Sequence, residues 1–92
     1  MIKTFAHKGL EAFHQKGRKA GIQPVHEKRL RLILGLLDAA TRPEDTNFPG
    51  SDFHGLTGKL AGFSAVKVNG NWRVVFRFEG QDAYDVDYVD YH

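Results

Sequence analysis

The sequence predicts an α+β fold: two N-terminal helices packed on one face of a small antiparallel sheet, in the order β-α-α-β-β-β. Three observations predict it. Apolar residues recur at helical spacing across residues 7–40, they alternate at strand spacing across residues 63–91, and turn signals separate the strands. Helices grouped before strands are typical of α+β domains. We expect residues 1–92 to form one domain with a modest core.

The N-terminal half predicts one short strand and two helices. Residues 2–5 favour extended structure, and residues 7–16 are expected to be helical, with Gly17 just after the helix end. Pro24 suits the first turn of a longer helix that runs to about Ala40. The apolar stripe of that helix consists of Leu30, Ile33, Leu34 and Leu37. Gly35 lies among them, where a small residue could permit a close contact between helix and sheet.

Residues 41 to about 58 are expected to form a long loop, because prolines and glycines interrupt both periodic patterns. Three strands follow, over residues 63–68, 72–78 and 83 to about 91. Asn69-Gly70 is a strong hairpin signal between the first two strands, since both residues accept positive φ. A second turn over residues 79–82 joins the last two strands.

The middle strand alternates cleanly between two sets of residues. The set expected to pack on the helices is Trp72, Val74, Phe76 and Phe78. Arg73 and Arg77 would then lie on the opposite face with Val75, and two guanidinium groups on a rigid sheet can bind phosphate. The alternative is that these arginines pair across strands with Asp85 or Asp87.

The first hairpin has two registers open to it, and they differ in the side of the sheet on which Lys67 lies. A two-residue turn pairs Lys67 with Trp72 on the core face. A three-residue loop over residues 69–71 pairs Lys67 with Arg73 and Val68 with Trp72. A buried lysine without a partner is costly, so the longer loop is favoured.

Basic residues are concentrated in the first half of the chain. Residues 1–40 carry eight Lys and Arg against three Asp and Glu, whereas residues 41–92 carry five against eight. A basic half attracts polyanions such as RNA. The run of Lys28, Arg29 and Arg31 is expected to be either a solvated helix face or a patch that contacts the ribosome.

The sequence lacks cysteines and long apolar runs, which limits the kinds of site it can form and the compartments we expect for it. The sequence has no cysteine, which excludes disulfides and thiolate metal ligands. It has no apolar run of the kind that a signal peptide or a membrane span requires. We therefore expect a cytoplasmic protein without a membrane partner.

Several residues have the chemistry that metal-free RNA cleavage needs: a base for the 2′-hydroxyl, cations for the phosphorane, and an acid for the leaving 5′-oxygen. His54 and His92 titrate near neutrality and could serve as acid or base. Asp90 could orient an imidazole or act as a base itself. The alternatives are that His54 is a loop residue without a role and that His92 is simply solvated.

Cationic and aromatic candidates complete this set. Arg73 is the best phosphate clamp, with Lys67 and Lys59 as supports, and Tyr91 could stack on an unpaired base. Other residues of the same types are expected to play no part in the site. His7, His14 and His26 are predicted to lie on the surface, and Tyr84 and Tyr88 to pack within the sheet.

Several motifs of the chain are specific enough to compare with known families. The longest is VKVNGNWR at residues 66–73, followed by FRF at 76–78, AYDV at 83–86 and VDYH at 89–92; the others are MIKTF at 1–5, HKGL at 7–10 and LDAAT at 37–41. In these motifs the sequence resembles the HigB toxins, the plasmid maintenance killer proteins within the RelE-like superfamily of type II toxin–antitoxin systems.

This resemblance implies a RelE-like fold and an endoribonuclease, an mRNA interferase that cuts mRNA in the ribosomal A site without a metal or other cofactor. It also implies contacts with 16S rRNA, a HigA-like helix-turn-helix antitoxin as partner, and binding to operator DNA only through the toxin–antitoxin complex. The positions that match the family's catalytic site are His54, Arg73, Asp90, Tyr91 and His92. The substrate-binding candidates are Lys59, Lys67 and Arg77.

The loop around His54 departs from the family pattern. Many relatives read His-Pro-Leu-Lys-Gly where this chain has HGLTG at residues 54–58, so the family's lysine is missing and Lys59 stands two positions later. Some relatives also carry a tryptophan where Ser64 stands. Two other functions remain open: a growth inhibitor that poisons DNA gyrase without cutting RNA, and a remnant that only binds its antitoxin.

Overall fold

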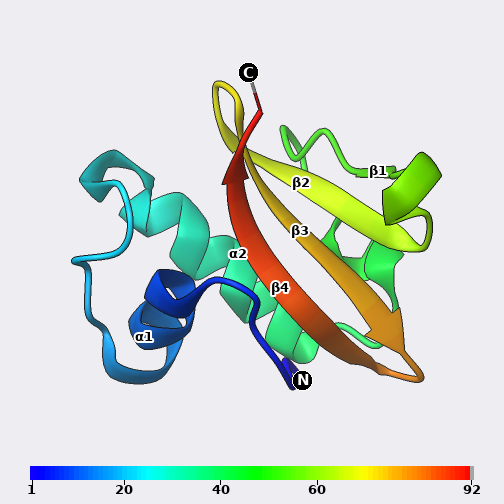
Figure 1. Ribbon diagram of the computed structural model, residues 1–92, viewed down its shortest axis with the longest axis horizontal. Helices are drawn as coiled ribbons and strands as arrows, with labels where there is room; N and C mark the ends of the chain where they lie inside the picture. The colour runs from blue at the N-terminus through cyan, green and yellow to red at the C-terminus, as the bar shows by residue number, and fades with distance from the viewer. Residues whose placement is uncertain (92) are drawn as a thin grey trace.

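The computed structural model describes residues 1–91, and in them two helices lie on one face of a four-stranded antiparallel sheet (Figure 1). The helices are α1 (Lys8–Lys16) and α2 (Glu27–Ala39), and the strands, in sheet order, are β1 (His54–Gly55), β2 (Phe63–Asn69), β3 (Trp72–Glu79) and β4 (Asp82–Asp90). Short 3₁₀ turns are η1 (Pro24–His26), η2 (Pro43–Thr46) and η3 (Gly58–Leu60). The α+β prediction is confirmed.

Both ends of α1 are capped by the residues next to it. The Nδ1 atom of His7 accepts a hydrogen bond of 3.0 Å from the backbone N–H of Leu10, which satisfies a free donor of the first turn. Gly17 follows the last turn with φ of 69°, and its N–H reaches the carbonyl of Phe13 at 3.0 Å. The predicted helix end is confirmed. His7, predicted to lie on the surface, is instead a half-buried capping residue.

The core lies between α2 and the helix-facing side of the sheet. α2 follows the η1 turn that Pro24 begins, as the sequence predicted. Its apolar stripe is buried against alternate residues of the long strands, and removing this surface from water is the main contribution to stability. The buried residues that meet there are Leu30, Ile33, Leu34, Leu37, Val66, Val74, Phe76 and Val86.

Gly35 takes no part in this packing. It is exposed, and a Cβ atom built on it would meet no atom within 4 Å. The predicted close contact between helix and sheet at Gly35 is therefore wrong. The helix instead approaches the sheet through its leucine and isoleucine side chains.

The N-terminal residues line the edge of β4 without forming a strand of their own. Ile2 and Phe5 make isolated parallel bridges to Ala83 and Val86. Between these bridges Asp85 has a positive φ of 55°, and its N–H bonds to the side chain of Thr4 at 2.8 Å instead of to a backbone carbonyl. This kink interrupts the ladder, so the predicted strand over residues 2–5 is reduced to two bridges. The sheet's remaining strand is β1, which lies inside the segment predicted to be a loop.

The β2–β3 hairpin combines features of both predicted registers. Lys67 pairs with Arg73, as favoured, but Asn69 rather than Val68 pairs with Trp72. The register shift between Lys67 and Asn69 leaves Val68 as the extra residue of a bulge, so the turn itself contains two residues. Val68 is buried with the core, which leaves Lys67 on the opposite face, beside Arg73.

We predict that Gly35→Ala stabilises the protein by about 0.5–1 kcal/mol, because alanine restricts the unfolded chain and has the higher helix propensity. The structure leaves open space for the added methyl group. Thermal or urea unfolding measures the change. The matched control is Gly17→Ala, which should destabilise, since Gly17 has positive φ. Equal destabilisation by the two substitutions would contradict the prediction.

Candidate functional site

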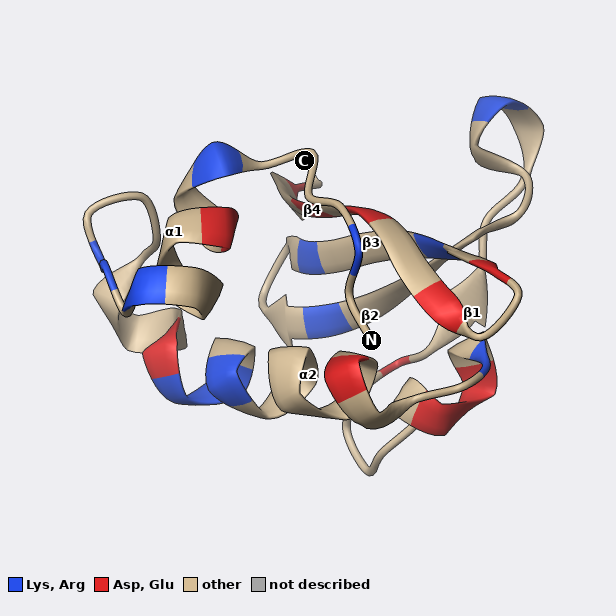
Figure 2. Cartoon of the chain, turned by 90° about the horizontal axis from the view of Figure 1, so that it is seen from below, with Lys and Arg blue, Asp and Glu red and all other residues tan. Residues whose placement is uncertain are grey.

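The face of the sheet that points away from the helices carries most of the predicted site. Antiparallel partners share a face, and Lys67 of β2, Arg73 of β3 and Val89 of β4 form one row. His54 of β1 pairs with Ala65, two residues from Lys67, and so lies on the same face in the neighbouring row. Figure 2 shows the basic residues of β2 and β3 beside acidic residues of β4.

The guanidinium of Arg73 is held by its own hairpin. Its Nη1 donates to the carbonyls of Gly70, at 2.7 Å, and Trp72, at 3.0 Å, and its side chain is 15% exposed. The carbon Cζ lies 5.9 Å from the centre of the Tyr91 ring. The buried Nε atom has no hydrogen-bond partner among the described residues. A fixed cation whose Nη2 faces a carboxylate only at 4.0 Å is suited to bind an anion.

Asp52, for which the sequence predicts no role, lies between His54 and Arg73. Its carboxylate Oδ2 lies 4.0 Å from the Arg73 Nη2, and its backbone carbonyl is 2.9 Å from the His54 Nδ1. A carbonyl oxygen can only accept, so Nδ1 carries the proton and Nε2 of the neutral imidazole is left as a proton acceptor. Nothing in the sequence separates Asp52 from the other acids of this loop.

The end of β4 brings Tyr91 to the same place. Its backbone N–H donates to the carbonyl of Asn71 at 2.8 Å, which ties the strand end to the β2–β3 turn. Asp90 pairs with Trp72, and because Trp72 packs against the core, the register turns Asp90 away from the Arg73 face. The role predicted for His92 lies outside the described residues. Lys59 lies in η3 and is exposed.

A concave pocket of about 470 Å³ lies beside Tyr91. Its apolar lining comes from the N-terminal segment, from η3 and from outward residues of the three long strands, and three acidic residues of β4 border it. The lining residues with apolar side chains are Ala6, Leu60, Phe63, Val75 and Val89, and the acids are Asp85, Asp87 and Asp90. An apolar pocket next to an aromatic ring and a cation suits a flat ring such as a nucleobase.

Arg77 lies on the same face as Arg73 but is engaged in ion pairs. Its guanidinium donates to Asp85 at 2.7 Å and to Glu79 at 2.6 Å, and its Cζ lies 5.2 Å from the centre of the Tyr84 ring. The hydrogen bonds that Arg77 donates to Asp85 and Glu79 raise its pKa. The cross-strand pairing weighed as the alternative for Arg77 is therefore present, and its part in substrate binding stays a prediction.

Arg29 anchors the loop that carries Asp52 and His54. Its Nη2 donates to the carbonyl of Gly50 at 2.8 Å, its Nε to the carbonyl of Lys67 at 3.4 Å, and its Cζ lies 4.8 Å from the centre of the Phe48 ring. The loop also pairs directly with β2, because the N–H of Lys67 donates to the carbonyl of Ser51 at 2.6 Å. The prediction that Arg29 belongs to a solvated face is wrong.

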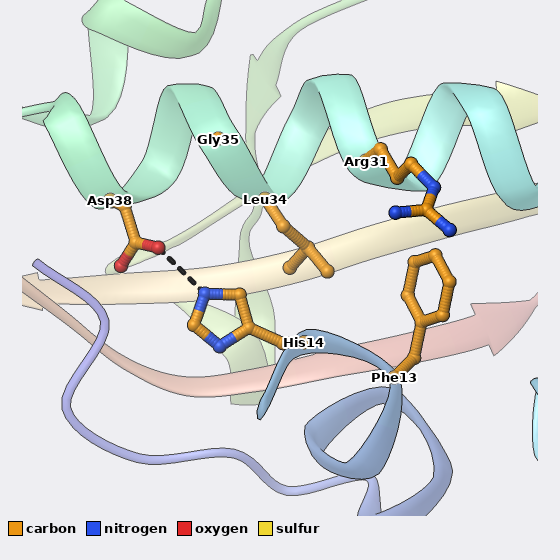
Figure 3. A pocket seen from close by; sticks show the side chains of 6 residues that line it. All are labelled: Phe13, His14, Arg31, Leu34, Gly35 and Asp38. Atoms are coloured by element: carbon orange, nitrogen blue, oxygen red, sulfur yellow. Dashed lines mark hydrogen bonds and ion pairs between the residues drawn. The ribbon is translucent and has the colours of Figure 1, made fainter. Parts of the chain in front are cut away.

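Two histidines predicted to lie on the surface are also engaged. His26 is buried, and its Nδ1 lies 2.6 Å from the hydroxyl of Tyr88. His14 is half-buried, and its Nε2 lies 2.6 Å from a carboxylate oxygen of Asp38, in a pocket of about 290 Å³ between α1 and α2 (Figure 3). Burial of the Asp38 carboxylate opposes ionisation, but hydrogen bonds from His14 and from the N–H of Ile2 outweigh it and lower the Asp38 pKa.

Two kinds of feature are absent from residues 1–91. No three side chains of His, Cys, Asp or Glu gather closely enough there to hold a metal ion. No helix in that part of the chain is long and apolar enough to cross a membrane.

Comparisons with known proteins agree on one family. A sequence model described as the RelE-like toxin of the type II toxin–antitoxin system HigB matches residues 3–92. The chain is 37% identical over 92 residues to Endoribonuclease HigB of Proteus vulgaris, and both chains are covered completely. It is 32% identical over 94 residues to Toxin HigB-1 of Vibrio cholerae, which covers all of this chain and 98% of that relative.

We predict that Arg29→Ala loosens the loop over residues 47–55 and lowers the free energy of unfolding by about 1–2 kcal/mol, through loss of the carbonyl contacts and the stacking on Phe48. Hydrogen exchange of the loop amides and urea unfolding measure the two effects. Arg31→Ala is the control, since Arg31 pairs within its own helix with Glu27. Unchanged exchange of the loop in Arg29→Ala would show that Arg29 is not its anchor.

Proposed function

The chain belongs to the HigB-like family of RelE-like toxins in type II toxin–antitoxin systems, and from this premise we propose that it is an endoribonuclease that cuts mRNA in the ribosomal A site. Its Proteus vulgaris relative carries the name of an endoribonuclease. The observation that carries the proposal is the grouping on one sheet face of Arg73, Lys67, His54 and the Tyr91 ring. These groups supply charge stabilisation, proton transfer and base stacking.

In the proposed reaction, Nε2 of His54 accepts the proton of a 2′-hydroxyl, whose oxygen attacks the adjacent phosphorus. Arg73 and Lys67 bind the phosphorane oxygens and offset their growing negative charge. The bond to the 5′-oxygen then breaks, and that oxygen takes a proton from His92, which Asp90 assists. The products are a 2′,3′-cyclic phosphate and a 5′-hydroxyl, formed without a metal or other cofactor.

Positioning of the substrate is divided between the toxin and the ribosome in this proposal. Tyr91 stacks on a base of the mRNA, and the ribosome presents the mRNA in an unpaired, extended form. The basic first half of the chain contacts 16S rRNA, because its excess of Lys and Arg suits a phosphate backbone. Lys59 is exposed on η3 beside the pocket residue Leu60, and it supports substrate binding in this proposal.

The antitoxin is the remaining partner. Toxins of type II systems are neutralised by a protein, and we propose a HigA-like helix-turn-helix antitoxin for this chain. The operator DNA is bound through the complex of the two proteins rather than by the toxin alone. Coexpression of the neighbouring reading frame, followed by copurification, tests this part of the proposal.

We predict that Arg73→Ala lowers the rate of mRNA cleavage on translating ribosomes by about 100- to 1000-fold, the usual effect of removing a charge-stabilising donor. Arg77→Ala is the matched control, from the same strand and the same face. Since Arg77 is occupied by Asp85 and Glu79, we expect it to alter stability more than cleavage. Mapping of reporter-mRNA ends measures the cuts.

Equal cutting by wild type, Arg73→Ala and Arg77→Ala would show that the site assignment is wrong. Intact mRNA during growth arrest by the wild type would show that the proposed activity is wrong. A melting curve for each variant confirms that the protein compared is folded. Loss of cutting in Arg77→Ala without loss of stability would instead support the substrate role predicted for Arg77.

We predict that Asp52→Asn strengthens binding of single-stranded RNA by about 2- to 5-fold, because it removes a carboxylate that competes with phosphate for Arg73. Asparagine tolerates the positive φ of 49° at this position. Filter binding at several salt concentrations measures affinity and its salt dependence. Glu44→Gln, an exposed residue of η2, removes the same charge elsewhere. An equal gain in RNA affinity in Glu44→Gln would show that the effect comes from net charge alone and not from the contact with Arg73.

A further inference from the structure

A buried aromatic cluster lies beneath the strand ends that carry the candidate site. The rings of Trp72 and Tyr88 are 4.5 Å apart between centroids and tilted by 30°. The imidazole of His26 meets both edge-on, at 5.6 Å from Trp72 and 5.9 Å from Tyr88. His26 and Tyr88 are 3% and 4% exposed. The proposed reaction uses none of these three side chains.

The hydroxyl of Tyr88 has a defined set of hydrogen bonds. The backbone N–H of Gln23 donates to its oxygen at 3.2 Å, and the His26 Nδ1 lies 2.6 Å away. The Gln23 N–H takes up one lone pair of the oxygen, and the hydroxyl can donate its proton to Nδ1. In this arrangement the imidazole is neutral and carries its own proton on Nε2. A protonated His26 would face the hydroxyl with a donor, and this hydrogen bond could not persist in the same form.

This cluster is connected to the site through the strand registers. Tyr88 pairs with Val74 and Trp72 pairs with Asp90, so Arg73 lies between the two β3 residues held by the cluster. Tyr91 follows directly and bonds to the carbonyl of Asn71, next to Trp72. Gln23 and His26 belong to the segment that leads into α2. The Tyr88 hydroxyl therefore ties the site-bearing ends of β3 and β4 to the helix layer.

We propose that His26 and Tyr88 are positioning residues for the candidate site: their hydrogen bond holds Arg73 and Tyr91 in the geometry for cleavage, and protonation of His26 releases it. The inference rests on the function proposed above. It concerns residues that need not touch RNA, because both are buried on the helix side of the sheet. The hydrogen bond should therefore affect the rate at which bound RNA is cut rather than the affinity for RNA.

Charged or titratable groups of the described residues lie on the elements packed around His26 and Tyr88. From the start of α1, His7 packs edge-on against Tyr88 at 5.4 Å while its Nδ1 caps the helix. From α2, Glu27 pairs with Arg31 and Lys19. From β4, Asp90 adds to the effect of burial in raising the pKa of Tyr88. The residue that β3 places against His26 is the neutral Trp72.

The direction of the pH effect follows from burial. Burial lowers the pKa of His26, so the folded protein binds this proton less readily than the unfolded chain does. The stability contributed by the neutral imidazole is complete above the unfolded value of 6.5 and is lost as the pH falls below it. Because the folded protein has the lower pKa, its own His26 takes up a proton only at still lower pH. The bond to Tyr88 is disturbed there, so cleavage by the folded protein should decline on the acid side of the range in which stability begins to fall.

The experiment compares cleavage of ribosome-bound mRNA by four full-length variants from about pH 8 to about pH 5.5. Tyr88→Phe removes only the hydroxyl, and Tyr84→Phe is the same change in a half-buried tyrosine of the same strand. His26→Leu removes the acceptor. His26→Asn keeps an acceptor at the δ position that does not titrate. Melting curves at each pH identify the conditions in which every variant is folded.

We expect Tyr88→Phe and His26→Leu to lower kcat by about 10-fold with little change in KM, as a small misplacement of a catalytic group does. Tyr84→Phe should cut like the wild type. His26→Asn should keep most of the wild-type kcat at the alkaline end. It should also lose the part of the acid-side decline that belongs to His26.

Each outcome decides between the two proposals. Two results would overturn the positioning role and leave the proposed function standing. One is a wild-type kcat in folded Tyr88→Phe. The other is a pH profile of His26→Asn identical to that of the wild type. If Tyr84→Phe and Tyr88→Phe both lower kcat in proportion to their loss of melting temperature, the effect comes from lost stability. That result also overturns the positioning role. Absence of cutting by the wild type overturns the proposed function, and the positioning role with it.

Discussion

Every second side chain of β3 is buried against the helices, and this alternation decides what the opposite face can offer. Because Val74 and Phe76 are fully buried, Arg73 must point away from the core. The pairing of β2 with β3 brings Lys67 to the same face. A slip of one residue would exchange the faces and bury both cations, so the cost of burying unpaired charge holds the core and the candidate site in one register.

Two local irregularities then give Arg73 and Arg77, near opposite ends of β3, different surroundings. The bulge at Val68 lets the hairpin turn close while Lys67 stays opposite Arg73, and the kink at Asp85 brings a carboxylate to Arg77. Arg77 is therefore neutralised by close acids. Arg73 is held mainly by main-chain carbonyls and faces a carboxylate 4.0 Å away. The contrast makes Arg73 the better phosphate clamp, although both arginines share a strand and a face.

The features predicted correctly are those with a local physical signal. Gly17 ends α1 because glycine accepts positive φ, the stripe through Leu30 and Leu37 is buried because it recurs at helical spacing, and β3 alternates with a period of two. The errors at His26 and Arg29 concern residues whose environment comes from distant parts of the chain. His26 is buried by Tyr88, 62 residues away, and Arg29 reaches carbonyls 21 and 38 residues away.

The sequence alone determined the helices, the long strands, the family and the side of the sheet on which Arg73 lies, because periodicity and turn chemistry act over a few residues. Tertiary structure alone decided that Asp52 stands between His54 and Arg73, that β1 extends the sheet, and that Tyr88 bonds to His26 beneath the strand ends. These contacts join segments far apart in the chain. They form only when burial of the core brings the helix layer and the loop against the sheet, which no local pattern encodes.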